Sequence, residues 1–154
     1  RLSDYGATFA TIHGNQALME RASENKNNLK ILAVTALTSL DRGDLDDLGF
    51  ACDVQDLVIS RAKRAFEAGC DGIVSSGLEV PFIREYVDNK LICVTPGIRP
   101  VANNDDQKRV VDVATAFKSG SDYIVVGRPI KNAANRYEAA SNIQKIIKKT
   151  FESV

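Results

Sequence analysis

Residues 122–130 read DYIVVGRPI, a short apolar stretch that ends abruptly in Gly127, Arg128 and Pro129. The β-branched residues predict a buried strand, and a glycine lets an anion approach the backbone closely. An arginine offers a planar fork of donors that suits phosphate oxygens. The stretch is therefore a candidate phosphate-binding strand end. The alternative is an ordinary strand end with a turn glycine and a surface salt bridge, because so short a motif is weak by itself.

The same unit, a short apolar strand followed by an amphipathic helix, is expected five times along the chain. The expected strands are residues 7–13, 29–37, 71–76, 91–95 and 122–130. Helices are expected between and after them, including a long one that Asp53 caps and Gly69 ends, and another over residues 107–119. Continuous apolar strands that alternate with helices predict an α/β protein with a parallel sheet.

Two architectures fit this alternation: an open doubly wound sheet and a (β/α)₈ barrel. Five units favour the open sheet by count. However, the G-x-G-x-x-G turn that open-sheet nucleotide binders carry after their first strand is absent. The candidate phosphate-binding residues instead follow the last two strands, which is where barrels commonly bind a phosphate.

Composition narrows the class of protein. The 154 residues fit one domain, and Lys plus Arg equals Asp plus Glu at 20 each, so net charge indicates neither nucleic acid nor an anionic membrane surface as a partner. No apolar run approaches the roughly 18 residues of a membrane span, and the start of the chain lacks a signal-peptide pattern. The three cysteines are widely spaced, which favours a reducing, cytoplasmic compartment and predicts buried packing for Cys70 and Cys93.

Small or polar residues follow every expected strand, and the carboxyl ends of parallel strands meet at one edge of a sheet. We therefore expect these groups to form one rim: His13-Gly14, Thr38-Ser39, Ser75-Ser76-Gly77, Thr95-Pro96-Gly97 and Gly127-Arg128-Pro129. A lone histidine at a strand end is more often a hydrogen-bonded rim residue than a catalyst, so His13 is assigned no role.

Five motifs occur in a fixed order along the chain: AVTALTSLDRGDLDDLG, DGIVSS, TPGIRP, DDQKRV and DYIVVGRPI. Together they resemble the C-terminal part of the bacterial orotidine 5'-monophosphate decarboxylase family, from about residue 7 to the end. The resemblance implies a (β/α)₈ TIM barrel and a cofactor-free decarboxylase that converts orotidine monophosphate to uridine monophosphate. It also implies a homodimer, because members of the family are dimers.

The resemblance also implies roles for single residues. Thr38 matches a position that contacts the pyrimidine edge, and Pro96 matches an apolar contact to the base. Phosphate-binding positions are matched by Arg99, Gln107, Gly127 and Arg128. Each has an ordinary alternative: a cap or turn threonine, a turn proline, a solvated loop arginine for Arg99 and a first-turn helix residue for Gln107.

One departure from the family is decisive for activity. The catalytic Asp-x-Lys-x-x-Asp run is absent, and the nearest stretches, residues 88–90 and 106–108, lack the second aspartate. We therefore expect no catalytic residue in this chain and no activity from it alone. Residues 1–154 are expected to be the C-terminal part of a single barrel domain that lacks about the first three of eight units, or roughly 75 to 90 residues.

A partial barrel would expose two strand edges and an apolar interior, so we expect it to pair with its missing part or with another chain. Two other functions remain open. One is another phosphate-binding barrel enzyme, such as a sugar-phosphate decarboxylase or aldolase. The stretches LTS (residues 37–39) and TPGIRP (residues 95–100) disfavour it, because they suit a pyrimidine nucleotide. The other is an inactive nucleotide-binding fragment.

Overall fold

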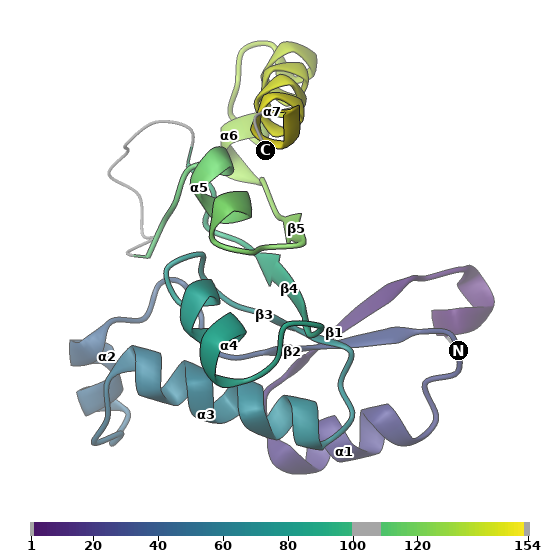
Figure 1. Ribbon diagram of the computed structural model, residues 1–154, viewed down its shortest axis with the longest axis vertical. Helices are drawn as coiled ribbons and strands as arrows, with labels where there is room; N and C mark the ends of the chain where they lie inside the picture. The colour runs from purple at the N-terminus through teal and green to yellow at the C-terminus, as the bar shows by residue number, and fades with distance from the viewer. Residues whose placement is uncertain (1, 100–108, 153–154) are drawn as a thin grey trace.

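The computed structural model, which describes residues 2–99 and 109–152, contains one parallel sheet with helices packed on it (Figure 1). The strands lie side by side in the order of the chain, and each pairs with the next in parallel. They are β1 (Phe9–His13), β2 (Lys30–Val34), β3 (Gly72–Val74), β4 (Ile92–Thr95) and β5 (Tyr123–Ile124). The predicted α/β fold of five consecutive β/α units is confirmed.

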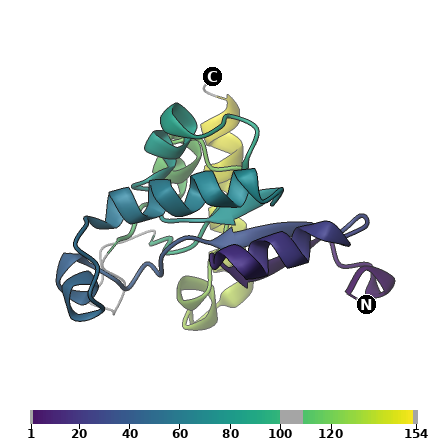
Figure 2. The same cartoon turned by 90° about the horizontal axis from the view of Figure 1, so that it is seen from below.

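A short 3₁₀ helix precedes the first strand, and at least one helix follows each strand along the chain (Figures 1 and 2). They are η1 (Leu2–Tyr5), α1 (Gln16–Glu24), α2 (Arg42–Asp47), α3 (Val54–Glu67), α4 (Val80–Tyr86), α5 (Val113–Lys118), α6 (Arg128–Lys131) and α7 (Arg136–Glu152). One core joins α1, α3 and α4 to β1–β4 through fully buried residues such as Met19, Val58 and Ile73. A second core, which includes Ile98, Val113 and Ile143, joins α5 and α7 to the end of the sheet.

The sheet curls strongly, as a contact between side chains of its two outermost strands shows. Phe9 of β1 and Tyr123 of β5 meet edge to face, with ring centroids 5.3 Å apart. In a flat sheet the two strands would be about 19 Å apart, at about 4.8 Å per strand. The face that carries these rings is therefore concave and corresponds to the inside of a barrel wall.

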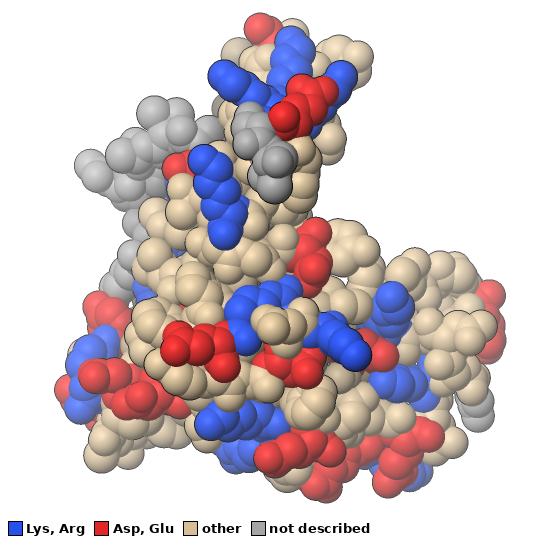
Figure 3. Space-filling model, in the orientation of Figure 1, with Lys and Arg blue, Asp and Glu red and all other residues tan. Residues whose placement is uncertain are grey.

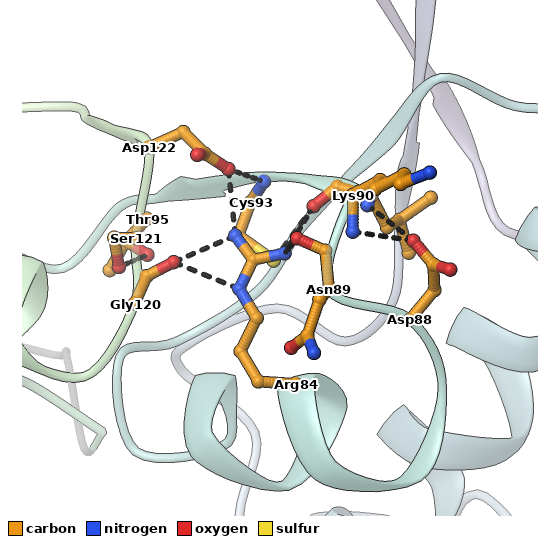
Figure 4. A network of polar contacts seen from close by, with 10 residues as sticks. Arg84, Asp88, Asn89, Lys90, Cys93, Thr95, Gly120, Ser121 and Asp122 are labelled. Atoms are coloured by element: carbon orange, nitrogen blue, oxygen red, sulfur yellow. Dashed lines mark hydrogen bonds and ion pairs between the residues drawn. The ribbon is translucent and has the colours of Figure 1, made fainter.

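The start of β5 is fastened to β4 by an aspartate and an arginine (Figure 4). Gly120, at φ +99°, lets the chain turn out of α5, and Asp122 follows two residues later. One carboxylate oxygen of Asp122 accepts the backbone N–H of Cys93 at 2.8 Å and a guanidinium N–H of Arg84 at 2.8 Å. The guanidinium also donates to the carbonyl of Gly120 at 3.0 and 2.7 Å.

The start of β3 uses the same arrangement. Residues 65–74 and 116–125 share the pattern A-F-x-x-G-x-D-x-I-V. Gly69 has φ +78°, and one carboxylate oxygen of Asp71 accepts from the backbone N–H of Ile31 and from Lys26 Nζ, both at 2.8 Å. Two units of the chain therefore set the register of neighbouring strands by the same contacts.

The predicted strand over residues 122–130 is wrong in its extent. β5 contains only two residues, and α6 begins at Arg128 with Pro129 in its first turn, where proline is favoured. The prediction of a buried strand is also wrong for Tyr123 and Val125, which are 49% and 50% exposed. Both face the concave side of the outermost strand, which the described residues leave partly open.

The predicted helix over residues 107–119 is shorter than expected. Asp112 caps α5 by accepting the backbone N–H of Thr115 at 2.8 Å, and Val111 pairs with Ile98 in an isolated parallel bridge. Val110 and Val111 therefore precede the helix instead of belonging to it, and residues 107–108 lie outside the described part.

Cys70 and Cys93 are buried, as predicted. Burial raises the pKa of both thiols, and that of Cys93 reaches about 11. Both side chains therefore stay protonated at neutral pH and fill space in the core.

Candidate functional site

The turn after β4 folds over the end of β2 at the carboxyl rim of the sheet. Gly97 has φ +75°, and a Cβ built on it would lie 3.5 Å from Thr38 Cγ2 and 3.1 Å from the carbonyl oxygen of Arg109. Only a residue without a side chain fits this turn at low cost. Thr38 is 7% exposed and also accepts the backbone N–H of Arg109 at 3.2 Å. The structure thus brings together Thr38 and the turn that contains Pro96.

Arg99 lies at the base of this turn and is buried, not a solvated loop charge. Its backbone N–H donates to the carbonyl of Val111 at 3.0 Å, and its Nη1 donates to the carbonyl of Ile98 at 2.9 Å. Only 7% of the residue is exposed. A buried guanidinium needs acceptors around it, and the carbonyl of Ile98 is one of them.

Gly127 and Arg128 lie at the end of the next strand. The backbone N–H of Val125 donates to the carbonyl of Thr95 at 2.8 Å, which holds the residues after β5 beside the end of β4. Gly127 is exposed, and a Cβ added to it would meet no atom within 4 Å. Arg128 is half-buried at the start of α6. The remaining predicted site residue, Gln107, lies outside the described residues.

Sequence reasoning missed a buried ion pair beneath this rim. Arg109 Nη1 donates to Glu79 Oε1 at 2.6 Å, with side chains 9% and 7% exposed. Its Nη2 donates to the carbonyls of Leu37 at 2.9 Å and Ala36 at 3.4 Å, while Ser76 Oγ donates to the carbonyl of Arg109 at 3.2 Å. Arg109 belongs to the DDQKRV motif, but its assignment to a helix gave no reason to expect these contacts.

Other kinds of site find little support in the described residues. Across residues 2–99 and 109–152, no group of three or more His, Cys, Asp or Glu side chains is arranged to hold a metal ion. Within the same ranges, no helix is both long and apolar enough to cross a membrane. Acidic and basic side chains are mixed on the face seen in Figure 3. His13 ends β1 with its side chain exposed.

Comparison with known proteins identifies a family. Residues 1–143 match the family described as Orotidine 5'-phosphate decarboxylase / HUMPS. The chain is 62% identical over 152 residues to the orotidine 5'-phosphate decarboxylase of Methylococcus capsulatus, and the match covers 97% of this chain and 63% of that protein. It is 47% identical over 138 residues to the enzyme of the same name from Nitrobacter winogradskyi, with 88% and 58% covered.

Solved structures agree with this likeness. The crystal structure of orotidine 5'-phosphate decarboxylase from Lactobacillus acidophilus superposes with a TM-score of 0.77 at 32% identity, covering 94% of this chain and 65% of that one. The enzyme from Pyrococcus horikoshii gives a TM-score of 0.67 at 25% identity, with 96% and 64% covered.

The chain thus spans somewhat less than two thirds of the length of these relatives. Its curled parallel sheet is part of a TIM barrel of this kind. From the family match, the identities and the superpositions together, this chain belongs to the orotidine 5'-phosphate decarboxylase family.

Proposed function

We propose that this chain is the pyrimidine- and phosphate-binding part of an enzyme that decarboxylates orotidine 5'-monophosphate to uridine 5'-monophosphate. The observation that carries the proposal is the rim, where the turn around Gly97 folds onto Thr38 and lies beside the strand end that carries Gly127 and Arg128. A base and a phosphate of one small nucleotide could be held by neighbouring parts of such a rim. The curated relatives that we compared carry this activity in their names.

The proposed roles follow from the chemistry of each group. The hydroxyl of Thr38 bonds the edge of the pyrimidine, and Pro96 offers an apolar surface to its ring. The phosphate is held by Arg99, Gln107, the backbone of Gly127 and the guanidinium of Arg128. Charged hydrogen bonds to phosphate are among the strongest that a protein makes, and the open space at Gly127 lets the anion approach the backbone.

We also propose that residues 1–154 are the C-terminal part of a single barrel domain. The outer edge of β1 borders a groove of about 640 Å³, whose lining includes Ala10 and Ile12 of β1 and Ala22 of α1. The preceding β/α units would pair with this edge and close the concave face. Those units would carry the catalytic Asp-x-Lys-x-x-Asp run, so the chain alone is proposed to be inactive.

A homodimer and a cytoplasmic location complete the proposal. The location is supported by the three cysteines, which are all free thiols, as suits a reducing compartment. Sedimentation of the chain, with and without the N-terminal third of the Methylococcus relative, tests the assembly. A stable, dispersed monomer of the bare chain would contradict the proposal that the concave face needs a cover.

Nucleotide binding tests the site directly. Calorimetric titration with uridine monophosphate, uridine and inorganic phosphate is expected to show binding of the monophosphate to the chain joined to the N-terminal third of its relative. The variant Gly127→Ala adds a methyl group that meets no protein atom within 4 Å, and its unfolding midpoint should fall only slightly, because alanine is a poorer N-cap for α6 than glycine. Its dissociation constant for the monophosphate should rise at least about tenfold, because the methyl group occupies the space of the phosphate.

The matched control is Gly43→Ala in α2, where the nearest atom to an added Cβ is 3.3 Å away, and it should bind like the parent. Decarboxylation is followed by the loss of orotidine monophosphate absorbance. Decarboxylation by the 154 residues alone would refute the proposal that this chain lacks the catalytic residues. If the completed chain, which is this chain joined to the N-terminal third of its relative, does not bind uridine monophosphate, the proposed site is refuted.

A further inference from the structure

The buried ion pair between Arg109 and Glu79 is unusual because it is incomplete. Among the described residues, neither Glu79 Oε2 nor Arg109 Nε has a hydrogen-bond partner, although both atoms are buried. Taking two charges out of water is costly, and a pair repays this cost only when its remaining hydrogen-bonding groups are satisfied. Stability alone therefore does not account for this pair.

The position of Arg109 indicates a different role. Its guanidinium reaches the carbonyls at the end of β2 and the carboxylate of Glu79 after β3. Its backbone bonds Thr38 and Ser76, and its carbonyl oxygen faces Gly97 after β4. One residue thus contacts the segments that follow three neighbouring strands.

The geometry of these contacts is specific to arginine. Nη1 bonds the carboxylate at 2.6 Å while Nη2 bonds the Leu37 carbonyl at 2.9 Å, so one rigid plane fixes two segments relative to each other. Leu37 is the residue before Thr38. A rotation of the guanidinium would therefore break its bond to the backbone just before Thr38.

We propose that Arg109, held in orientation by Glu79, is a positioning residue that aligns Thr38 with the Gly97 turn to receive the pyrimidine of the nucleotide. The inference rests on the proposed function, but its structural half can be measured without a ligand. Arg109 acts through Thr38 and the turn and need not touch the nucleotide.

The test separates positioning from stability by removing one charge or both. Arg109→Met alone leaves a buried, uncompensated carboxylate, so both the unfolding midpoint and the affinity for uridine monophosphate should fall. The double variant Arg109→Met/Glu79→Leu removes both charges, so its unfolding midpoint should return toward that of the parent. Its dissociation constant should stay at least about tenfold above the parent value, because the bond to the Leu37 carbonyl is still missing.

A double variant that regains the parent dissociation constant together with the parent midpoint would overturn the proposal. Arg109→Lys provides a second measurement if the double variant does not fold. A lysine keeps the charge beside Glu79 but cannot bond both acceptors with a rigid fork, so about a tenfold loss of affinity is expected with a smaller fall in the midpoint than in Arg109→Met. Parent affinity in Arg109→Lys would also overturn the proposal. Lys148→Met/Glu152→Leu, which removes an exposed ion pair of α7, is the matched control and should bind like the parent.

Amide hydrogen exchange separates a failure of this inference from a failure of the proposed function. The N–H of Arg99, bonded to the Val111 carbonyl, reports on the base of the turn. Without any nucleotide, Arg109→Lys should speed its exchange about tenfold relative to the parent and the control, as expected for a local opening made easier by that factor. Unchanged exchange would refute positioning, even if uridine monophosphate binds. If the completed parent does not bind the nucleotide, the proposed function and the role in binding both fail.

Discussion

Replacing Arg84 by alanine is expected to lower the free energy of unfolding by about 3 kcal/mol. The guanidinium makes five hydrogen bonds: two to the Gly120 carbonyl, one each to the carbonyls of Asn89 and Leu91, and one to Asp122. They join α4 to the starts of β4 and β5 (Figure 4). All the donor positions of the side chain are therefore used.

The magnitude follows from counting acceptors rather than bonds. Three backbone carbonyls would lose a charged donor, each worth about 1 kcal/mol in net terms. The ion pair to Asp122 adds less than about 1 kcal/mol, because that carboxylate is 45% exposed and solvent screens it. Arg84→Lys should lose about half as much as the alanine variant, since one ammonium cannot span the same acceptors.

The assay is urea unfolding followed by circular dichroism, with Arg21→Ala as the control. Arg21 pairs with Glu24 on the surface of α1, where the side chains are 80% and 54% exposed, so its removal should cost no more than about 0.5 kcal/mol. Equal unfolding midpoints for Arg84→Ala and Arg21→Ala would refute the reasoning.

A double-mutant cycle sharpens the same test. A Cβ at Gly120 would lie 3.2 Å from Arg84 Cγ and 3.3 Å from its Nε, at a φ that L-residues rarely adopt. Gly120→Ala should therefore cost less in the Arg84→Ala background than in the parent, because the steric part of its cost disappears. Strict additivity of the two changes would show that this close contact is unimportant.

Three further results are expected. Asp112→Ala should lower the free energy of unfolding by about 1 kcal/mol at pH 7, because the N-cap of α5 is lost. The hydrogen bond from the Thr115 backbone N–H lowers the pKa of Asp112. The stabilisation by the cap is therefore fully present above the ordinary aspartate pKa of about 3.9 and should fade as pH drops through the lowered pKa. A difference between variant and parent in urea unfolding that does not change with pH would contradict this. Iodoacetamide at pH 8 should modify the half-buried Cys52 before Cys93, whose pKa of about 11 leaves only about one thiolate in a thousand; mass spectrometry of timed samples would show the reverse order if this is wrong. Gly97→Ala should cost about 1 to 3 kcal/mol in thermal unfolding, because the turn has φ +75° and the new Cβ would lie 3.1 Å from a backbone oxygen, and an unchanged midpoint would contradict this.

Much of the candidate site could be predicted from the sequence because parallel strands all end at the same edge. Thr38, Pro96 and Gly127 each follow a strand, so their place on one rim depends only on recognising the strands. The ordered motifs added roles that no single residue could indicate. Burial of Arg99 rules out the alternative of a solvated loop charge, which sequence reasoning had left open, and its role toward phosphate stays a prediction.

The sequence by itself determined the succession of five β/α units, since short apolar runs and amphipathic helices are local patterns. It also determined that the Asp-x-Lys-x-x-Asp run is absent. Only the tertiary structure decided how far the sheet curls, because Phe9 and Tyr123 meet across 114 residues of chain. Only it revealed that Arg109 bonds Glu79 and Leu37, which lie 30 and 72 residues away. Such contacts depend on how elements pack against one another, and no periodicity within one element records them.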